Sequence, residues 1–292
     1  MPQPEQNRHL PGSRATLWFA IALALLSCLP FLVVAHPQLT DYPSHLARYH
    51  VMLAHDRSAY LREYYDFSWI LTGNLGADLL MVPLGRLLGV EPAARLIGLI
   101  IPPLTGLSLV SVAWSLRRRI GVGTLLAFAT IWSPAMGMGF YNFCLSLALA
   151  LFAFAGWIRL EGRRWRWVVM VPAGLLVWLC HASGWGVLGV LVFGYEWHRR
   201  KGLAAVLAPW PLLPPALAML LTTGGAGSLN YGRDLANYKV GIWVKALRDQ
   251  AFQLDFMSLV AIGLAILAAL GFRKIDGRVG WAALILGLLT IA

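Results

Sequence analysis

Long apolar runs separated by short polar connections dominate this sequence. A helix needs about 20 apolar residues to cross the hydrocarbon core of a bilayer. Runs that reach or approach this length lie at 15–36, 95–116, 120–138, 141–160, 203–223 and 256–272, with shorter ones at 167–181, 183–197 and 279–292. The pattern predicts an all-α, polytopic helical membrane protein with about nine spans in a single transmembrane domain over residues 1–292. Because the last run stops at residue 292 without a flanking charge, we expect an incomplete final span and a chain truncated at its C-terminus.

Segment 73–90 is ambiguous, because it is apolar but contains Asp78, Pro83 and Arg86. A charge at the centre of a spanning helix costs about 3 kcal/mol on insertion scales. Cytoplasmic connections are enriched in Lys and Arg, and this charge rule favours a segment that stays at the surface. The short basic connections then lie on the same side of the membrane as the N-terminal tail. Tail and connections together hold 15 of the 24 basic residues: Arg8, Arg14, Arg117, Arg118, Arg119, Arg159, Arg163, Arg164, Arg166, Arg199, Arg200, Lys201, Arg273, Lys274 and Arg278. We therefore expect a cytoplasmic tail at 1–14 and two outer loops, at 36–94 and 224–255.

Both outer loops contain patterns typical of amphipathic helices that lie on a membrane surface. In the first loop, Leu46, Tyr49 and Leu53 recur at spacings of three and four, and Asp41 is placed to cap their helix. In the second loop an apolar face is formed by Trp243, Val244, Leu247, Ala251 and Leu254. We expect these two surface elements to cover one cavity at the outer face.

Composition and charge support a membrane location. The chain is 59% hydrophobic and 13% charged, which differs from the composition of soluble domains. Its net charge of +11 could suggest a nucleic-acid partner, but the positive residues fall in short clusters between apolar runs. Their natural partner is the anionic surface of the lipid bilayer, so we expect no nucleic-acid binding. The expected location is the bacterial inner membrane, with the N-terminus in the cytoplasm.

Candidate chemistry gathers on the outer side, where nine of the 13 acids are expected: Asp41, Asp56, Glu63, Asp66, Asp78, Glu91, Asp234, Asp249 and Asp255. Asp41 and His45 are four residues apart at a helix start, so they project close together. Such a pair can act as a base, orient a base or ligate a divalent ion. The alternative interpretation is a capping Asp beside an interfacial His.

Two further candidates lie at the outer ends of predicted spans. His181 ends the run at 167–181 and could face the same cavity as His45, or it could be a wetted helix-end histidine in a turn with Ser183 and Gly184. Asn142, in "GMGFYNF", offers hydrogen bonds at headgroup level, although a turn with an aromatic anchor also explains this stretch.

Several basic residues are expected outside, against the charge rule. Arg48 and Arg62 lie in the first outer loop, and Arg233 and Lys239 flank "DLANY" in the second. Guanidinium and ammonium groups bind phosphate through charge-assisted hydrogen bonds, so these four residues are candidate substrate ligands. Pairing with the nearby outer acids is the alternative.

The order of these features resembles the GT-C superfamily of multi-pass, polyprenyl-phosphate-sugar-dependent glycosyltransferases, over roughly residues 15–200. The resemblance rests on "HPQLTDYPSH" after the first span, a long first outer loop, "NLGADLLMVPLGRLLGVEPAARLIGLIIPPL", and a span ending in "RRR" before "GVGTLLAFATIWSPAMG". It implies transfer of a sugar from a polyprenyl-phosphate donor at the outer face of the membrane.

By position, Asp41 matches the family's first-loop acid, which activates the acceptor hydroxyl or helps to hold a divalent cation. The resemblance therefore makes a divalent cation the candidate cofactor and Asp41 its candidate ligand. This chain departs from the commoner pattern because Tyr, Pro, Ser and His follow a lone Asp, where many members have a second acid. His45 and His181 have no counterpart in the family pattern.

Two other functions remain open: a transporter or flippase of lipid-linked intermediates, and a non-catalytic membrane assembly protein. Transport predicts charges near the middle of several spans. This sequence keeps its spans nearly free of charge, which favours the enzyme.

Overall fold

The computed structural model describes residues 12–222, 252–271 and 275–291, and these residues form helices and connections without a strand. The all-α fold class is therefore confirmed. Arg233, Lys239 and nearly all of the second outer loop lie outside the described residues. The helices are α1 (Gly12–Leu26), α2 (Leu29–Val33), α3 (Tyr42–Ala54), η1 (His55–Arg57), α4 (Ala59–Tyr64), α5 (Gly76–Leu88), α6 (Val90–Arg117), α7 (Val122–Ala127), η2 (Phe128–Thr130), α8 (Pro134–Met138), α9 (Tyr141–Arg159), α10 (Arg166–Cys180), α11 (Ala182–Arg200), α12 (Gly202–Leu207), η3 (Trp210–Leu212), α13 (Pro214–Thr222), α15 (Phe252–Gly271) and α16 (Gly277–Ile291).

Four described stretches are long and apolar enough to cross a membrane: Arg14–Val33, Val90–Arg117, Tyr141–Arg159 and Gln253–Gly271. A fifth arises if Gly202–Leu212 and Pro214–Leu221, which meet at an angle of 59°, are counted as one bent span. These helices are compatible with a multi-pass membrane protein. The predicted number of nine spans is not confirmed, because Val122–Met138, Arg166–Cys180 and Gly277–Leu289 are shorter apolar helices.

Three of the predicted spans are interrupted, among them the run at 203–223, which divides into α12, η3 and α13. The first breaks into α1 and α2, where Pro30 occupies the first turn of α2. The run at 120–138 breaks into α7, η2 and α8, and Pro134 begins the last of these. Proline lacks a backbone N–H, which costs nothing in the first turn of a helix, and Pro30 and Pro134 both occupy that position.

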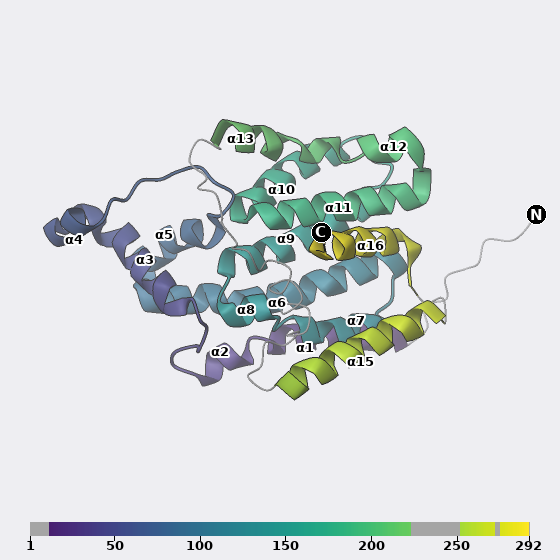
Figure 1. Cartoon of the computed structure of the whole chain (residues 1–292), viewed down its shortest axis with the longest axis horizontal. Helices are drawn as coiled ribbons and strands as arrows, with labels where there is room; N and C mark the ends of the chain where they lie inside the picture. Colours follow the sequence, from purple (N-terminus) through teal and green to yellow (C-terminus); the bar gives the residue numbers. More distant parts are fainter. Residues whose placement is uncertain (1–11, 223–251, 272–274, 292) are drawn as a thin grey trace, which may run out of the picture.

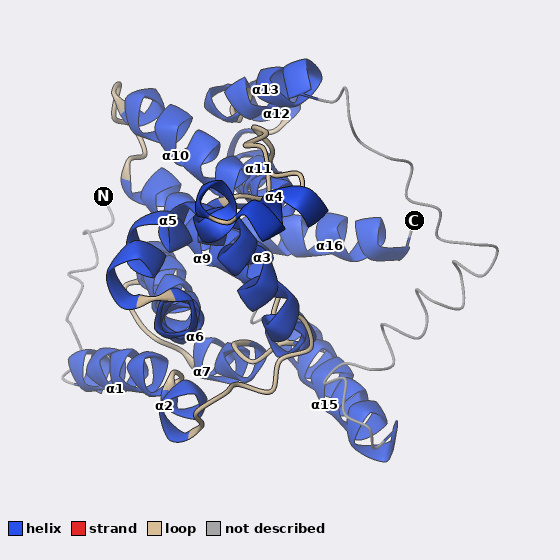
Figure 2. Cartoon of the chain, turned by 90° about the vertical axis from the view of Figure 1, so that its left-hand side faces the viewer, coloured by secondary structure: helices blue, strands red, loops and turns tan. Residues whose placement is uncertain are grey.

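The helices pack as a bundle with extra elements gathered at one end. In Figure 1, α6, α9, α11 and α16 lie side by side, while α3, α4 and α5 lie at the left-hand end. Figure 2 views the molecule from that end and places α3 and α4 in front. Close packing of α9 on α11 requires Gly184, because a Cβ there would overlap the Ser146 side chain. We call the end that carries α3, α4 and α5 the α3 end.

Segment 73–90 folds as α5, whose 13 residues are too few to cross a bilayer alone. The predicted apolar face of α3 is also present, since Tyr49 is buried and Leu46 and Leu53 pack beside it. Asp41 occupies the N-cap position of α3, but its side chain makes no capping hydrogen bond, contrary to the expectation from sequence.

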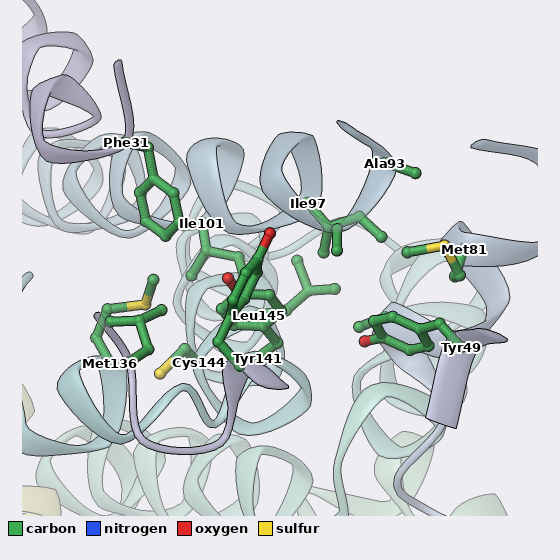
Figure 3. Packing of buried hydrophobic residues seen from close by; sticks show 14 of the residues in the cluster. Phe31, Tyr49, Met81, Ala93, Ile97, Ile101, Met136, Tyr141, Cys144 and Leu145 are labelled. Carbon is green, nitrogen blue, oxygen red and sulfur yellow. The ribbon is translucent and has the colours of Figure 1, made fainter. Parts of the chain in front are cut away.

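An apolar cluster beneath α3 supports the α3 end of the bundle. Figure 3 shows Tyr141 between Ile97, Ile101 and Leu145, with Tyr49 and Met81 to one side. Full burial of an Ile, Leu or Met side chain stabilises the folded state by roughly 1.5–3 kcal/mol relative to leaving it exposed. The cluster therefore fixes α3, α5 and the start of α9 relative to one another.

The opposite end is held together by a buried carboxylate. Glu196 on α11 has no exposed surface, and its Oε1 accepts a hydrogen bond from Trp157 Nε1 (2.9 Å) on α9. Arg166 Nη1 on α10 lies 3.2 Å from the same oxygen, and Arg200 Nε lies 2.9 Å from Oε2. Glu196 thus ties three helices together.

Candidate functional site

A cavity of about 480 Å³ opens at the α3 end. Five of the residues predicted for the site line it: Asp41, His45, Arg48, Asn142 and His181. They come from the start of α3, the start of α9 and the connection between α10 and α11, which are far apart in the sequence. Asn74, Asp78, Ala135, Phe140, Tyr141 and Phe143 complete the lining.

Asp41 presents a carboxylate that has no partner among the described residues. Its backbone N–H donates to the carbonyl of Met138 (2.8 Å), which fixes the start of α3 against α8. The side chain is partly buried and makes no hydrogen bond or ion pair with the described residues. The carboxylate is therefore available to a ligand in the cavity.

His45 is held in one orientation. Its Nε2 lies 2.9 Å from the carbonyl oxygen of Gly139. A carbonyl only accepts, so Nε2 donates the proton, and Nδ1 of the neutral ring keeps a free lone pair. The ring stacks against Tyr49 and Tyr141, with centroid distances of 5.8 Å and 5.5 Å. His45 can therefore accept a proton or a hydrogen bond at Nδ1.

Asp78 is a site residue that the sequence analysis did not select. It lies in the first turn of α5, is 2% exposed and faces the cavity. Arg48 Nε lies 2.9 Å from Oδ1, but the N–H does not point at this oxygen, so the contact is an ion pair and not a hydrogen bond. The terminal nitrogens of Arg48 make no hydrogen bond with the described residues. In the sequence, Asp78 stands out as a carboxylate inside the apolar segment 73–90, a feature that bears on whether this segment spans the membrane.

Asn142 positions Asp78 and the first turn of α5. Its Oδ1 accepts the backbone N–H of Ala77 (2.5 Å), one of the N–H groups that a helix start leaves without an internal partner. Its Nδ2 donates to the backbone and side-chain oxygens of Asn74 (2.9 and 3.0 Å) and to Asp78 Oδ2 (3.2 Å). Both polar atoms of the Asn142 side chain are thus engaged by the protein, although the residue lines the cavity.

His181 has a structural contact as well as a place in the cavity. Its Nδ1 accepts the backbone N–H of Ser183 (3.1 Å) and caps α11, so the proton of the neutral ring is on Nε2. Ser146 Oγ donates to the His181 carbonyl (2.9 Å), and the ring packs edge-on against Phe143. Burial lowers the pKa of His181, which favours this neutral form near pH 7. His181 therefore lines the same cavity as His45, as one interpretation predicts, and it also ends a helix in a turn with Ser183, as the other predicts.

Arg62 does not line the cavity. Its Nη1 donates to the backbone oxygen of Asp56 (2.8 Å), which shapes the connection before α4. Arg233 and Lys239 lie outside the described residues, so their predicted roles stay predictions. The divalent-cation expectation also stays a prediction: within the described residues, no group of three or more His, Cys, Asp and Glu side chains is placed to hold a metal ion.

The cavity thus combines a free carboxylate, an imidazole with an unprotonated nitrogen, an imidazole that donates, and a guanidinium beside a buried acid. Such a set can remove a proton from a hydroxyl and bind an anion within the same small volume. No protein-family model, curated protein or solved structure matches this chain.

Proposed function

We propose that this protein is an integral membrane glycosyltransferase that moves a sugar from a polyprenyl-phosphate donor to an acceptor hydroxyl at the outer face of the membrane. One observation carries the proposal: the cavity at the α3 end joins the free Asp41 carboxylate to Arg48, a cation with unused donors. Proton removal and phosphate stabilisation are the two tasks of this transfer.

In the proposed reaction the acceptor oxygen attacks the anomeric carbon of the donor sugar. The bond from that carbon to the phosphate oxygen breaks, and polyprenyl phosphate leaves with the electron pair. Asp41 takes the acceptor proton, and Arg48 stabilises the phosphate. Asp78 positions Arg48, while His45 Nδ1 and His181 Nε2–H orient the reactants by accepting and donating hydrogen bonds.

The proposed topology places the α3 end outside the cell and the N-terminus in the cytoplasm of a bacterium, with nine spans. It is supported by the basic connections, since Arg118, Arg163 and Arg200 all lie at or beyond helix ends that the charge rule assigns to the cytoplasm. A lipid-linked donor would then enter the cavity from the outer leaflet of the bilayer.

The test uses the purified full chain in lipid nanodiscs with radiolabelled polyprenyl-phosphate sugars, and it measures the release of polyprenyl phosphate. Asp41→Asn is expected to lower turnover by about 10²–10⁴-fold, the usual contribution of a general base. Asp66→Asn is the matched control, because Asp66 is an exposed acid of the same loop that does not line the cavity. Undiminished turnover of Asp41→Asn removes this residue from the proposed role.

The same preparation separates the alternatives. A flippase would move the intact lipid-linked sugar across a proteoliposome membrane without bond cleavage, and an assembly protein would tolerate Ala at Asp41 and Arg48. The charged cavity side chains lie at helix starts and connections, and each candidate span has an 18-residue window with at most two charged residues. This distribution favours chemistry at one face over transport through the middle.

A further inference from the structure

A second cavity, of about 440 Å³, lies between α1 and the C-terminal end of α6. Five residues line it: Arg14, Leu17, Trp18, Trp114 and Arg118. None of them belongs to the cavity at the α3 end. The two cavities lie toward opposite ends of α6, which is 28 residues long. Asp78 lies on α5, before the start of α6, and Arg118 follows the last residue of α6.

The two arginines in this cavity have no acceptor within residues 12–222, 252–271 and 275–291. Arg14 and Arg118 are exposed, and their side chains make no hydrogen bond or ion pair with the described residues. No acid in the described part of the chain lines the cavity. The neighbouring Arg117 differs, because its Nε donates to Asp276 Oδ2 (3.0 Å). Two guanidinium groups that line one cavity, with no counter-charge among the described residues, indicate a site for an anion.

The remaining lining residues, Leu17, Trp18 and Trp114, are apolar or aromatic. Trp18 is 67% exposed on α1, while Trp114 on α6 packs against the cluster of Ala20, Val110 and Ile120. Arg14, Trp18 and Leu25 are separated by four and seven residues, so they lie on one face of α1. Leu25 is 51% exposed. Along this face a cation is followed by an indole and then by aliphatic surface, which is the order of groups that a phospholipid meets at a bilayer boundary.

The ends of two candidate spans set the depth of the cavity. Arg14 begins the apolar stretch that runs to Val33, and Arg117 ends the stretch that begins at Val90. Because α1 and α6 pack together, these charged ends lie at the same level, where headgroups meet hydrocarbon. An anion held there can keep its attached acyl chains in the bilayer.

We infer that this cavity binds an anionic phospholipid. Its phosphodiester accepts hydrogen bonds from Arg14 and Arg118, its glycerol region packs against Trp18 and Trp114, and an acyl chain runs along α1 past Leu25. A net negative headgroup matches the two positive charges, so phosphatidylglycerol binds more tightly than phosphatidylcholine. The inference does not depend on the proposed transfer reaction.

The test is native mass spectrometry of the delipidated full chain titrated with phosphatidylglycerol, phosphatidylcholine or glycerol 1-phosphate. One phosphatidylglycerol is expected to bind at least about tenfold more tightly than either other probe, because the site uses both the charge and the chain. Equal binding of phosphatidylcholine overturns the charge argument. Equal binding of glycerol 1-phosphate overturns the assignment to a lipid.

Variants separate this cavity from general surface charge. Arg14→Gln/Arg118→Gln is expected to weaken phosphatidylglycerol binding about tenfold or more, while Arg163→Gln/Arg164→Gln, which removes two exposed charges from the connection between α9 and α10, leaves binding unchanged. Equal losses in both pairs overturn the proposal. If the glutamine pair does not fold, Arg14→Lys/Arg118→Lys and Trp18→Ala take its place. Binding retained by the lysine pair and reduced by Trp18→Ala supports the site, and no effect of Trp18→Ala contradicts it.

Discussion

Replacement of Asn142 by Ala tests the network that holds the first turn of α5. The substitution removes the acceptor of the Ala77 N–H and the Asn142 donor to Asp78 Oδ2. Ala77 has no exposed surface and Asp78 is 2% exposed, so both groups depend on protein partners in the folded state. Leaving a buried polar group without a partner costs about 1–3 kcal/mol, so the two together cost about 2–6 kcal/mol.

The assay is the midpoint of thermal unfolding of the purified protein in detergent at a fixed heating rate. At about 2–3 °C per kcal/mol for a chain of this length, the midpoint is expected to fall by roughly 4–18 °C. Asn74→Ala is the matched control, since Asn142 Nδ2 retains the Asn74 backbone oxygen after that change. A midpoint for Asn142→Ala within the range of the Asn74→Ala control refutes the reasoning.

A double-mutant cycle assigns the effect to the contact between Asn142 and Asp78. Asn142→Asp keeps an acceptor for the Ala77 N–H but places a carboxylate oxygen against Asp78 Oδ2, so this variant is also destabilised. Adding Asp78→Asn restores a donor to that contact. The double variant is expected to be about 1–2 kcal/mol more stable than the sum of the two single effects predicts.

Two further predictions concern the bundle itself. Gly184→Ala is expected to destabilise the protein by about 1–3 kcal/mol, because its Cβ overlaps Ser146, whereas Gly189→Ala on the same helix meets no atom within 4 Å and leaves the thermal midpoint nearly unchanged. Asp276→Asn is expected to destabilise the protein at pH 7, and the difference from the unsubstituted protein is expected to shrink below about pH 4. Hydrogen bonds, first of all from Arg278, lower the pKa of Asp276 in the folded state. The contribution of Asp276 to stability is therefore present above the ordinary carboxyl pKa and is lost as the pH falls. Thermal midpoints of both proteins at several pH values measure this difference.

The helical class and most segment positions follow from the sequence, because burial of apolar surface in a bilayer requires long apolar helices. The breaks are harder to predict. Pro30 and Pro134 are visible in the sequence, yet a proline can kink a helix or start a new one, and neighbouring helices decide which occurs. The start of α3 shows the same limit: Asp41 stands at the N-cap, but the side chain is free because Met138 fixes the backbone there.

The candidate site could be predicted only in part. Asp41, His45 and Arg48 share one helix start, so their proximity follows from helix geometry. His181 joins them through packing of the α10–α11 connection, which no local pattern encodes. Asp78 was missed as a site residue because its partner Asn142 is 64 residues away, and only the folded chain shows that a donor and a cation offset the burial of this carboxylate.

The two ends of the bundle use their carboxylates differently. At the end opposite α3, Glu196 and Asp276 both pair with arginines of other helices or connections, and Glu196 is fully buried, so breaking its ion pair costs about 3–5 kcal/mol. At the α3 end, Asp78 is paired with Arg48, but Asp41 has no partner among the described residues and still faces a cavity. The backbone hydrogen bond to Met138 sets the position of Asp41, but among the described residues its carboxylate has no partner. The carboxylate is therefore open to a molecule that enters the cavity, and the Asp41→Asn assay tests the role that we propose for it.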